Sequence, residues 1–207
     1  MAIDVHSPEL RIVSADDATI LDLDPIQGLW TGEQYLRITD SSRWLLEFTD
    51  GKLEVLPMPT EQHQAMLGFL YVALLSFLQP RGGKVFFAPL RLQLREGKFR
   101  EPDLLIMRDA QDPRRQNAYW LGADLVIEIV SPDNPERDTI VKRGDYADAH
   151  IPEYWIVNPE DQTITVLRLD GDLYAEYGVF GRGETVRSLL LESFSVTVND
   201  VLDAQKD

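Results

Sequence analysis

The spacing of apolar residues along the chain predicts where its helices lie. Between residues 60 and 78 apolar side chains recur every three or four positions, which places them on one face of a helix of about five turns. Pro80 follows and ends this pattern. A shorter helix is predicted over residues 31–38, because Thr31 is a suitable N-cap.

Shorter apolar runs predict the strands. Two antiparallel hairpins are expected, from residues 44–48 with 53–56 and from residues 85–94 with 100–107. The first turns at Asp50-Gly51, a pair that tolerates positive φ, and the second at residues 96–98. Strands are also predicted over residues 154–157, 163–168 and 173–177.

Residues 125–130 form an apolar run that is too short for a helix. Gly122 and Pro132 bound it, which is typical of a central strand covered on both faces. A helix is predicted to follow over residues 136–150, with Asn134 as N-cap and Pro135 at the first helical position.

The order of these elements predicts an α/β fold with a mixed β-sheet flanked by helices. Residues 1–30 are the least regular and are expected to form an N-terminal arm or edge element. A single domain is then predicted over residues 31–207.

Composition narrows the functional classes. The chain has 207 residues, 44% of them hydrophobic, and no cysteine, which excludes disulfide scaffolds, thiol nucleophiles and thiolate metal sites. No run approaches about 18 apolar residues, and the first residues lack the features of a signal peptide. A cytoplasmic location is therefore expected.

The net charge of −15 disfavours casual binding to nucleic acid, because an acidic surface repels phosphates. The charge is uneven, however. Six basic residues against Glu96 give residues 81–100 a local charge of +5; they are Arg81, Lys84, Arg91, Arg95, Lys98 and Arg100. This segment is either a solvated hairpin face or a surface that meets a polyanion, with Arg91, Arg95 and Arg100 as candidate DNA-facing residues.

Glu128 is the strongest candidate for chemistry. It is the only charged residue in the apolar run 125–130, and a carboxylate buried without a partner costs several kcal/mol or loses its charge. It is either paired with an arginine or lysine, or it is a metal ligand or acid–base group. Asp103, which follows Pro102 and opens a predicted strand, is its natural companion. Two close carboxylates would suit Mg²⁺ or Mn²⁺.

Lys142 lies on the helix predicted after the Glu128 strand. Asp138 is four residues earlier, so an ordinary surface pair is one interpretation. Beside a two-carboxylate metal site, the same lysine would orient an attacking water or neutralise developing charge.

Together these residues resemble the PD-(D/E)XK phosphodiesterase superfamily, and more narrowly the Uma-type putative restriction endonuclease family. The resemblance runs from about residue 31 to the end of the chain. It is carried by Glu47 with Asp50-Gly51, by the helix entry at residues 57–63, by residues 101–104 and 126–132, by Lys142 with Tyr146, and by residues 151–157.

The resemblance implies a restriction-endonuclease-like core, extended by an N-terminal hairpin, in which Asp103 and Glu128 hold Mg²⁺ or Mn²⁺ for DNA cleavage. A homodimer is expected, because cleaving both strands of a duplex usually needs two active sites. The resemblance also suggests Glu47, His63 and Tyr146 as accessory residues. One departure matters: the motif lysine is expected two residues after the acid, where this chain has Val130. Lys142 is the expected substitute. The alternatives are a nuclease fold that binds without turnover and a structural domain in which Glu128 only pairs with a buried cation.

Overall fold

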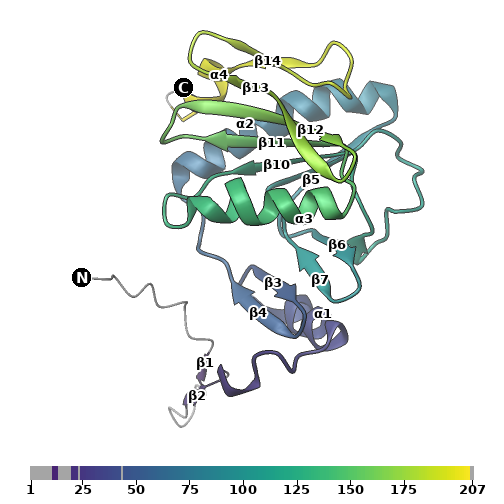
Figure 1. The fold of residues 1–207 in the computed structure, drawn as a ribbon, viewed down its shortest axis with the longest axis vertical. Coiled ribbons are helices and arrows are strands. Elements are labelled where there is room, and N and C mark those ends of the chain that lie inside the picture. Colours follow the sequence, from purple (N-terminus) through teal and green to yellow (C-terminus); the bar gives the residue numbers. More distant parts are fainter. Residues whose placement is uncertain (1–10, 14–19, 23, 43, 206–207) are drawn as a thin grey trace. The chain divides into compact units, whose positions relative to one another are not determined.

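The computed structural model describes residues 11–13, 20–22, 24–42 and 44–205 (Figure 1). It groups the chain into two compact units. Residues 1–58 with 96–100 form the first unit, and residues 59–95 with 101–207 form the second. The boundary predicted at residue 30 does not coincide with this division. Residues 1–10, 14–19 and 23 of the predicted arm lie outside the described residues.

The first unit contains two hairpins, one further strand that pairs with the second hairpin, and a helix. Its elements are β1 (Arg11–Val13), β2 (Ile20–Asp22), a 3₁₀ turn (Asp24–Ile26), α1 (Gly32–Ser41), β3 (Leu46–Thr49), β4 (Lys52–Val55) and β7 (Lys98–Arg100). β1 pairs with β2, and β3 pairs with both β4 and β7, all antiparallel. Thr31 caps α1 in a reciprocal capping box with Gln34, as the predicted N-cap requires. Asp50 and Gly51 both have positive φ, which confirms the first predicted hairpin.

The second unit is built on a six-stranded mixed sheet. The strand order is β13-β12-β11-β10-β8-β5, and only β10 and β11 are parallel. The strands are β5 (Lys84–Phe87), β8 (Leu104–Met107), β10 (Leu125–Ile129), β11 (Glu153–Asn158), β12 (Thr163–Asp170) and β13 (Leu173–Phe180). The central position of β10 and the three strands after it agree with the sequence prediction.

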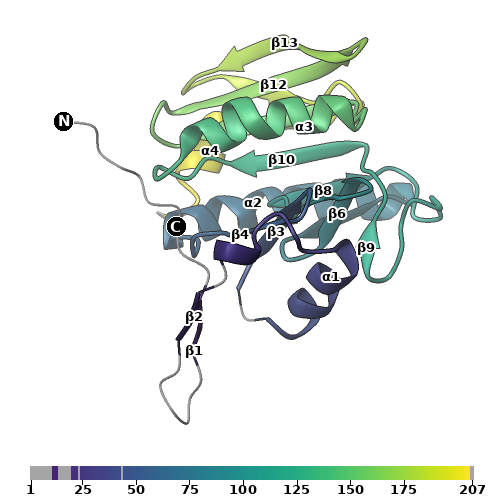
Figure 2. The ribbon, with the colours of Figure 1, turned by 60° about the horizontal axis from the view of Figure 1, so that its bottom comes forward.

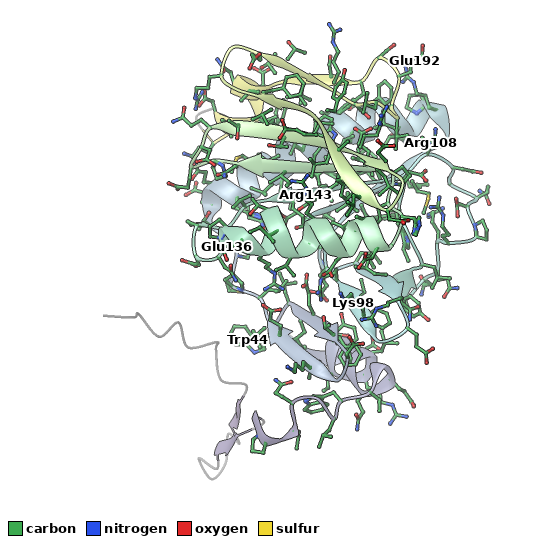
Figure 3. The ribbon with its side chains drawn as sticks, in the orientation of Figure 1. Trp44, Lys98, Arg108, Glu136, Arg143 and Glu192 are labelled. Atoms are coloured by element: carbon green, nitrogen blue, oxygen red, sulfur yellow. The ribbon has the colours of Figure 1, made fainter. Side chains whose placement is uncertain are left out.

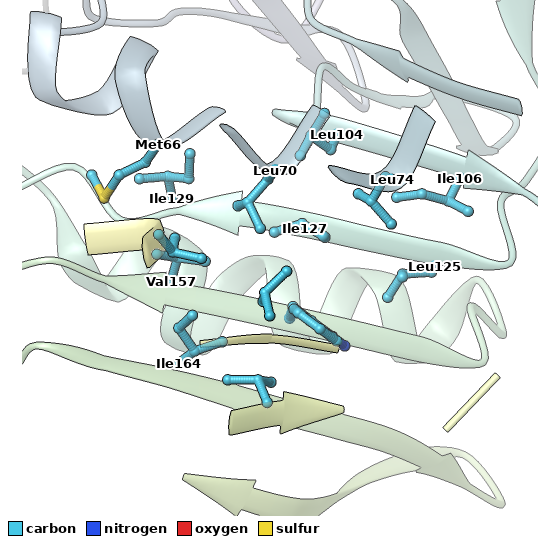
Figure 4. Packing of buried hydrophobic residues seen from close by; sticks show 14 of the residues in the cluster. Met66, Leu70, Leu74, Leu104, Ile106, Leu125, Ile127, Ile129, Val157 and Ile164 are labelled. Atoms are coloured by element: carbon cyan, nitrogen blue, oxygen red, sulfur yellow. The ribbon is translucent and has the colours of Figure 1, made fainter. Parts of the chain in front are cut away.

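Helices cover the two faces of this sheet (Figure 2). The long helix α2 (Glu61–Leu78), capped by Thr60 and followed by a 3₁₀ turn (Gln79–Arg81), packs its apolar side on one face. Figure 4 shows Leu70 and Leu74 of α2 against Ile127 of β10. The opposite face packs against Tyr146 and neighbouring residues of α3 (Lys142–Asp148). Because side chains alternate along a strand, β10 sends its odd-numbered residues toward α2 and its even-numbered residues toward α3.

Two predictions of secondary structure are corrected. The second predicted hairpin is interrupted on both strands, because Pro89 and Pro102 lack the N–H group that a continuous ladder needs. The first predicted strand is divided into β5 and β6 (Arg91–Arg95), and the second into β7 and β8. Of these, β5 pairs with β8. Within the second unit, β6 also pairs with the short β9 (Tyr119–Trp120).

The helix after β10 also begins differently from the prediction. A π-helical turn (Arg137–Val141) precedes α3, and its N-cap is Glu136 rather than Asn134. Figure 3 shows Glu136 at the start of this helix and Arg143 further along it. The last elements are β14 (Thr185–Arg187), β15 (Ser195–Thr197) and α4 (Val198–Leu202), which the apolar pattern does not predict. Among the described residues, no helix has the length and apolar character needed to cross a membrane.

Candidate active site

Asp103 and Glu128 lie side by side in the second unit. The antiparallel register pairs Leu104 of β8 with Ile127 of β10, so the preceding Asp103 stands opposite Glu128. The Asp103 backbone N–H lies 3.4 Å from Glu128 Oε2. Glu128 belongs to the even-numbered residues of β10, which place its carboxylate on the α3 face of the sheet. The two candidate ligands are therefore brought together from segments 25 residues apart in the sequence.

The Asp103 carboxylate is held by two donors through one of its oxygens. Oδ2 accepts a 2.7 Å hydrogen bond from the Ile129 N–H and lies 3.1 Å from His63 Nε2. In the part of the chain that the structure describes, the other oxygen, Oδ1, makes no hydrogen bond within the protein. Asp103 is thus fixed in orientation while one oxygen remains available as a ligand.

His63 reaches Asp103 from the first turn of α2. Its backbone N–H bonds to the capping hydroxyl of Thr60, which ties this turn to the helix start. Burial alone would lower the pKa of His63, but the hydrogen bond and charge of Asp103, together with the charge of Asp138, outweigh it and raise the pKa. The other ring nitrogen, Nδ1, is buried and has no hydrogen-bond partner among the described residues. His63 therefore serves best as an orienting partner for Asp103.

The second carboxylate oxygen of Glu128, Oε1, contacts two donors. Lys142 Nζ lies 2.9 Å from Oε1, and the Tyr146 hydroxyl donates a short hydrogen bond to the same atom. Lys142 and Tyr146 are four residues apart and so share a face of the helix. Glu128, Lys142 and Tyr146 are all nearly inaccessible to solvent. The Lys142 ammonium and the Tyr146 hydroxyl therefore act on Glu128 with little screening by water.

Asp138 adds a third carboxylate, which sequence reasoning treated only as a helix-pair partner of Lys142. Its Oδ1 lies 3.0 Å from Lys142 Nζ, and both side chains are buried rather than on the surface. The i, i+4 spacing to Lys142 was the available signal for this position. That spacing alone does not show that the helix faces the Glu128 strand and that the pair is buried.

The cluster combines acidic and basic side chains. Its three carboxylates are those of Asp103, Glu128 and Asp138; Lys142 contacts Glu128 and Asp138, and His63 contacts Asp103. Burial, reinforced by the charges of Asp138 and Asp103, raises the pKa of Glu128 to about 8, although Lys142 and Tyr146 act in the opposite direction. Glu128 is thus driven toward its protonated form, and an added cation would stabilise its ionised form instead.

Val130 occupies the position where the motif has lysine. Its side chain is buried in the cluster that also contains Tyr146 and Tyr154, and its N–H bonds to Val157 in β11. An ammonium group at residue 130 would be surrounded by apolar atoms. Lys142 instead brings an ammonium to Glu128 from the helix.

The remaining candidates are Glu47 and Arg100 in the first unit and Arg91 and Arg95 in the second. Glu47 of β3 is buried, and its Oε2 lies 3.4 Å from the Arg100 guanidinium. Arg100 also donates to Thr49 and is only 5% exposed, so it does not present its charge to DNA as the sequence suggested. Arg91 of β6 is half-buried and Arg95 is exposed. Of the three candidate DNA-facing arginines, Arg95 is thus the best placed to meet a polyanion.

The residues present fit a hard divalent cation. Asp103 and Glu128 supply carboxylate oxygens, and a 2+ ion would favour the ionised form of Glu128. In the described ranges no three histidine or acidic side chains converge as a complete set of metal ligands. Mg²⁺ commonly binds through only one or two carboxylates, with water and substrate phosphate completing its shell. Asp103 and Glu128 would thus supply two of the ligands of such an ion.

Comparisons with known proteins show the family and the fold of the chain. A family model described as "Putative restriction endonuclease" (Uma2) matches residues 32–199, a range that contains every site residue above. The structure is similar to that of a "putative nuclease belonging to DUF820" from Anabaena variabilis, with a TM-score of 0.71 and 21% sequence identity over 85% of this chain and 99% of that chain. No curated protein matches. The structural likeness confirms the predicted α/β fold with a mixed sheet flanked by helices.

Proposed function

The chain belongs to the Uma2 family of putative restriction endonucleases, and we propose that it is a metal-dependent endonuclease that hydrolyses DNA phosphodiester bonds. The observation that carries this proposal is the adjacency of Asp103 and Glu128, with Lys142 and Asp138 packed beside Glu128. Glu128 is kept close to two other carboxylates although burial and their charges raise its pKa, and a bound cation would stabilise its ionised form.

In this proposal Asp103 and Glu128 hold Mg²⁺ or Mn²⁺. When bound, the ion would polarise a phosphate oxygen and lower the pKa of a water molecule. His63 and the Ile129 N–H fix Asp103 through Oδ2. Tyr146 fixes Glu128 through Oε1. Lys142 stabilises negative charge that develops on the phosphate, because its ammonium is buried and already positioned.

DNA is the proposed substrate despite the net charge of −15. A bound divalent cation reverses the local field at the carboxylates, and the exposed Arg95 adds positive charge on β6. Cutting both strands of a duplex ordinarily needs two active sites, so we propose a homodimer. A cytoplasmic location remains a prediction from the sequence.

Nicking of supercoiled plasmid tests the proposal. Wild-type protein should nick DNA with Mg²⁺ or Mn²⁺ and stop when EDTA is added, and Asp103→Asn and Glu128→Gln should abolish nicking. Glu153→Gln is the matched control, because Glu153 is a buried glutamate on the neighbouring strand β11 with its own donors at Trp155, Leu189 and Leu190. Activity that survives in the Asp103 and Glu128 variants would overturn the proposed site.

The second candidate is a nuclease fold that binds metal without turnover. The buried Val130 favours it, since the lysine of the motif is absent from the strand. Isothermal titration with Mn²⁺ separates the two functions when it is combined with the nicking assay. Binding of Mn²⁺ without nicking would support the second candidate, and binding with nicking would support the first.

A further inference from the structure

A cavity of about 530 Å³ lies in the second unit at the outer edge of its sheet, away from the residues assigned above. Its volume is within the range of about 300–1,000 Å³ that is usual for ligand sites. The lining combines two aromatic rings, one guanidinium and three carboxamides, contributed by Phe86, Trp120, Arg115, Gln111, Gln116 and Asn117. This mixture of flat apolar surface and hydrogen-bonding groups differs from the purely apolar packing of the core.

The aromatic wall lies on the same face of the sheet as the carboxylates. Phe86 of β5 pairs with Leu105 of β8, and Leu105 follows Asp103 by two positions. Side chains of paired residues point to the same face, so Phe86 shares the face of Asp103 and Glu128. The Phe86 ring meets Trp120 edge to face with their centroids 5.5 Å apart. Phe86 is 39% exposed, which leaves part of its ring available to a planar ligand.

Arg115 carries a donor that makes no hydrogen bond within the described residues. Its guanidinium lies 5.5 Å from the centroid of the Trp120 ring, and Nη1 donates to the Ala110 carbonyl. Nε is buried and is the donor without a partner. This arrangement is unfavourable, and a ligand would satisfy Nε once the Arg115 side chain turns toward the cavity.

The loop that carries Arg115 and the carboxamides is held by its own contacts. Arg114 Nη2 lies 2.7 Å from both Asp112 and Asp124, which ties the loop to the start of β10. The Gln111 N–H bonds to the Asp109 side chain at 2.8 Å. The charge of Asp112 is thus engaged by Arg114, and the lining groups are presented by an ordered loop.

We propose that this cavity binds one unpaired nucleobase of the substrate strand. This inference rests on the proposed nuclease function and names how the substrate would be recognised. Aromatic rings stack on bases of any sequence. Arginine donors match the O6 and N7 acceptors of guanine, and the carboxamides can pair with the donor and acceptor groups along a base edge.

Binding of isolated nucleotides tests this inference without any cleavage step. Titration calorimetry would use the Asp103→Asn protein in EDTA with dGMP, deoxyguanosine and 2-deoxyribose 5-phosphate as probes. We expect dGMP and deoxyguanosine to bind at least tenfold more tightly than the sugar phosphate. Equal binding of dGMP and the sugar phosphate would show a phosphate site and overturn the inference.

Variants locate the binding. Phe86→Ala and Arg115→Gln should each weaken dGMP binding about tenfold or more, with the fold checked by circular dichroism. Tyr177→Ala, a half-exposed aromatic on β13, and Arg37→Gln, an exposed arginine of α1, are the matched controls. Wild-type affinity in both cavity variants would overturn the inference. Plasmid nicking is measured separately from nucleotide binding. Failure of the nuclease proposal would therefore show as absent nicking, and failure of the base-binding proposal would show as absent or unspecific dGMP binding.

Discussion

Lys142 Nζ lies 2.9 Å from Glu128 Oε1, although the lysine is on a helix and the glutamate is in the central strand. The strand position that the motif assigns to lysine holds the buried Val130. The spatial relation between acid and ammonium is therefore present without the sequence spacing that usually produces it. The site also differs from an ordinary buried ion pair, because the charges of Asp103 and Asp138 both act on Glu128.

Lys142→Met should reduce nicking at least about 100-fold, because it removes a pre-positioned charge from the site. The variant should also lose about 3–5 kcal/mol of unfolding free energy in metal-free buffer, since Glu128 stays buried without its ammonium. Mn²⁺ should still bind and should restore part of that stability. Lys84→Met, at an exposed residue of β5, is the control. An unchanged nicking rate in Lys142→Met would reduce the lysine to a structural role.

Tyr146→Phe should weaken the site by releasing Glu128. The hydroxyl donates to Glu128 Oε1, so its loss should raise the Kd for Mn²⁺ and lower the nicking rate about tenfold while costing about 1–3 kcal/mol of stability. Tyr174→Phe is a matched control, because that buried hydroxyl donates to the Ile151 carbonyl. Equal losses of stability with wild-type Mn²⁺ affinity in both variants would contradict the assigned role of Tyr146.

Glu153 provides a pH-dependent prediction outside the site. Burial raises its pKa above the ordinary value of 4.5, although it accepts hydrogen bonds from Trp155 and from two backbone N–H groups. The raised pKa favours the protonated form in the folded state. Its contribution to stability is thus full below about pH 4.5 and is lost as the pH rises through the folded-state pKa.

Chemical denaturation of wild type and Glu153→Gln across this range measures that effect, because the difference between them cancels the other titrating groups. The unfolding free energy of wild type should fall relative to the variant as the pH rises above 4.5. A relative gain by wild type would mean that the three donors outweigh burial.

Arg100 should matter for folding rather than for DNA binding. Arg100→Met leaves Glu47 buried without its guanidinium in the first unit, so a loss of about 3–5 kcal/mol is expected. Arg95→Met should instead reduce the slope of log K against log salt by about 1, with little change in stability. Fluorescence anisotropy with labelled DNA at several salt concentrations measures that slope. A reduced slope in a folded Arg100→Met protein would contradict this assignment.

The sequence predicted the parts of the fold that depend on local patterns. The apolar period of α2, the cap at Thr31 and the turn at Asp50-Gly51 are each set by neighbouring residues. The division of the second hairpin was missed because its strands pair across a long separation, which pattern alone does not show. The proline positions were visible, but their effect depends on which strands become partners.

The candidate site was predictable only as a set of residue types. Glu128 stood out because a charge in an apolar strand is unusual, and Asp103 followed from the preceding proline. The role of Asp138 and the burial of Arg100 with Glu47 depend on which helix or strand face turns inward. That choice is made by tertiary packing, so the sequence could not distinguish a buried cluster from surface pairs.

The most direct test of the central claim is anomalous diffraction from crystals soaked in Mn²⁺. The account predicts a peak at about 2.0–2.3 Å from one oxygen of Asp103 and one of Glu128 in wild-type protein, and none in Asp103→Asn. A wild-type map with no peak between these two carboxylates, at a Mn²⁺ concentration that supports nicking, would contradict it.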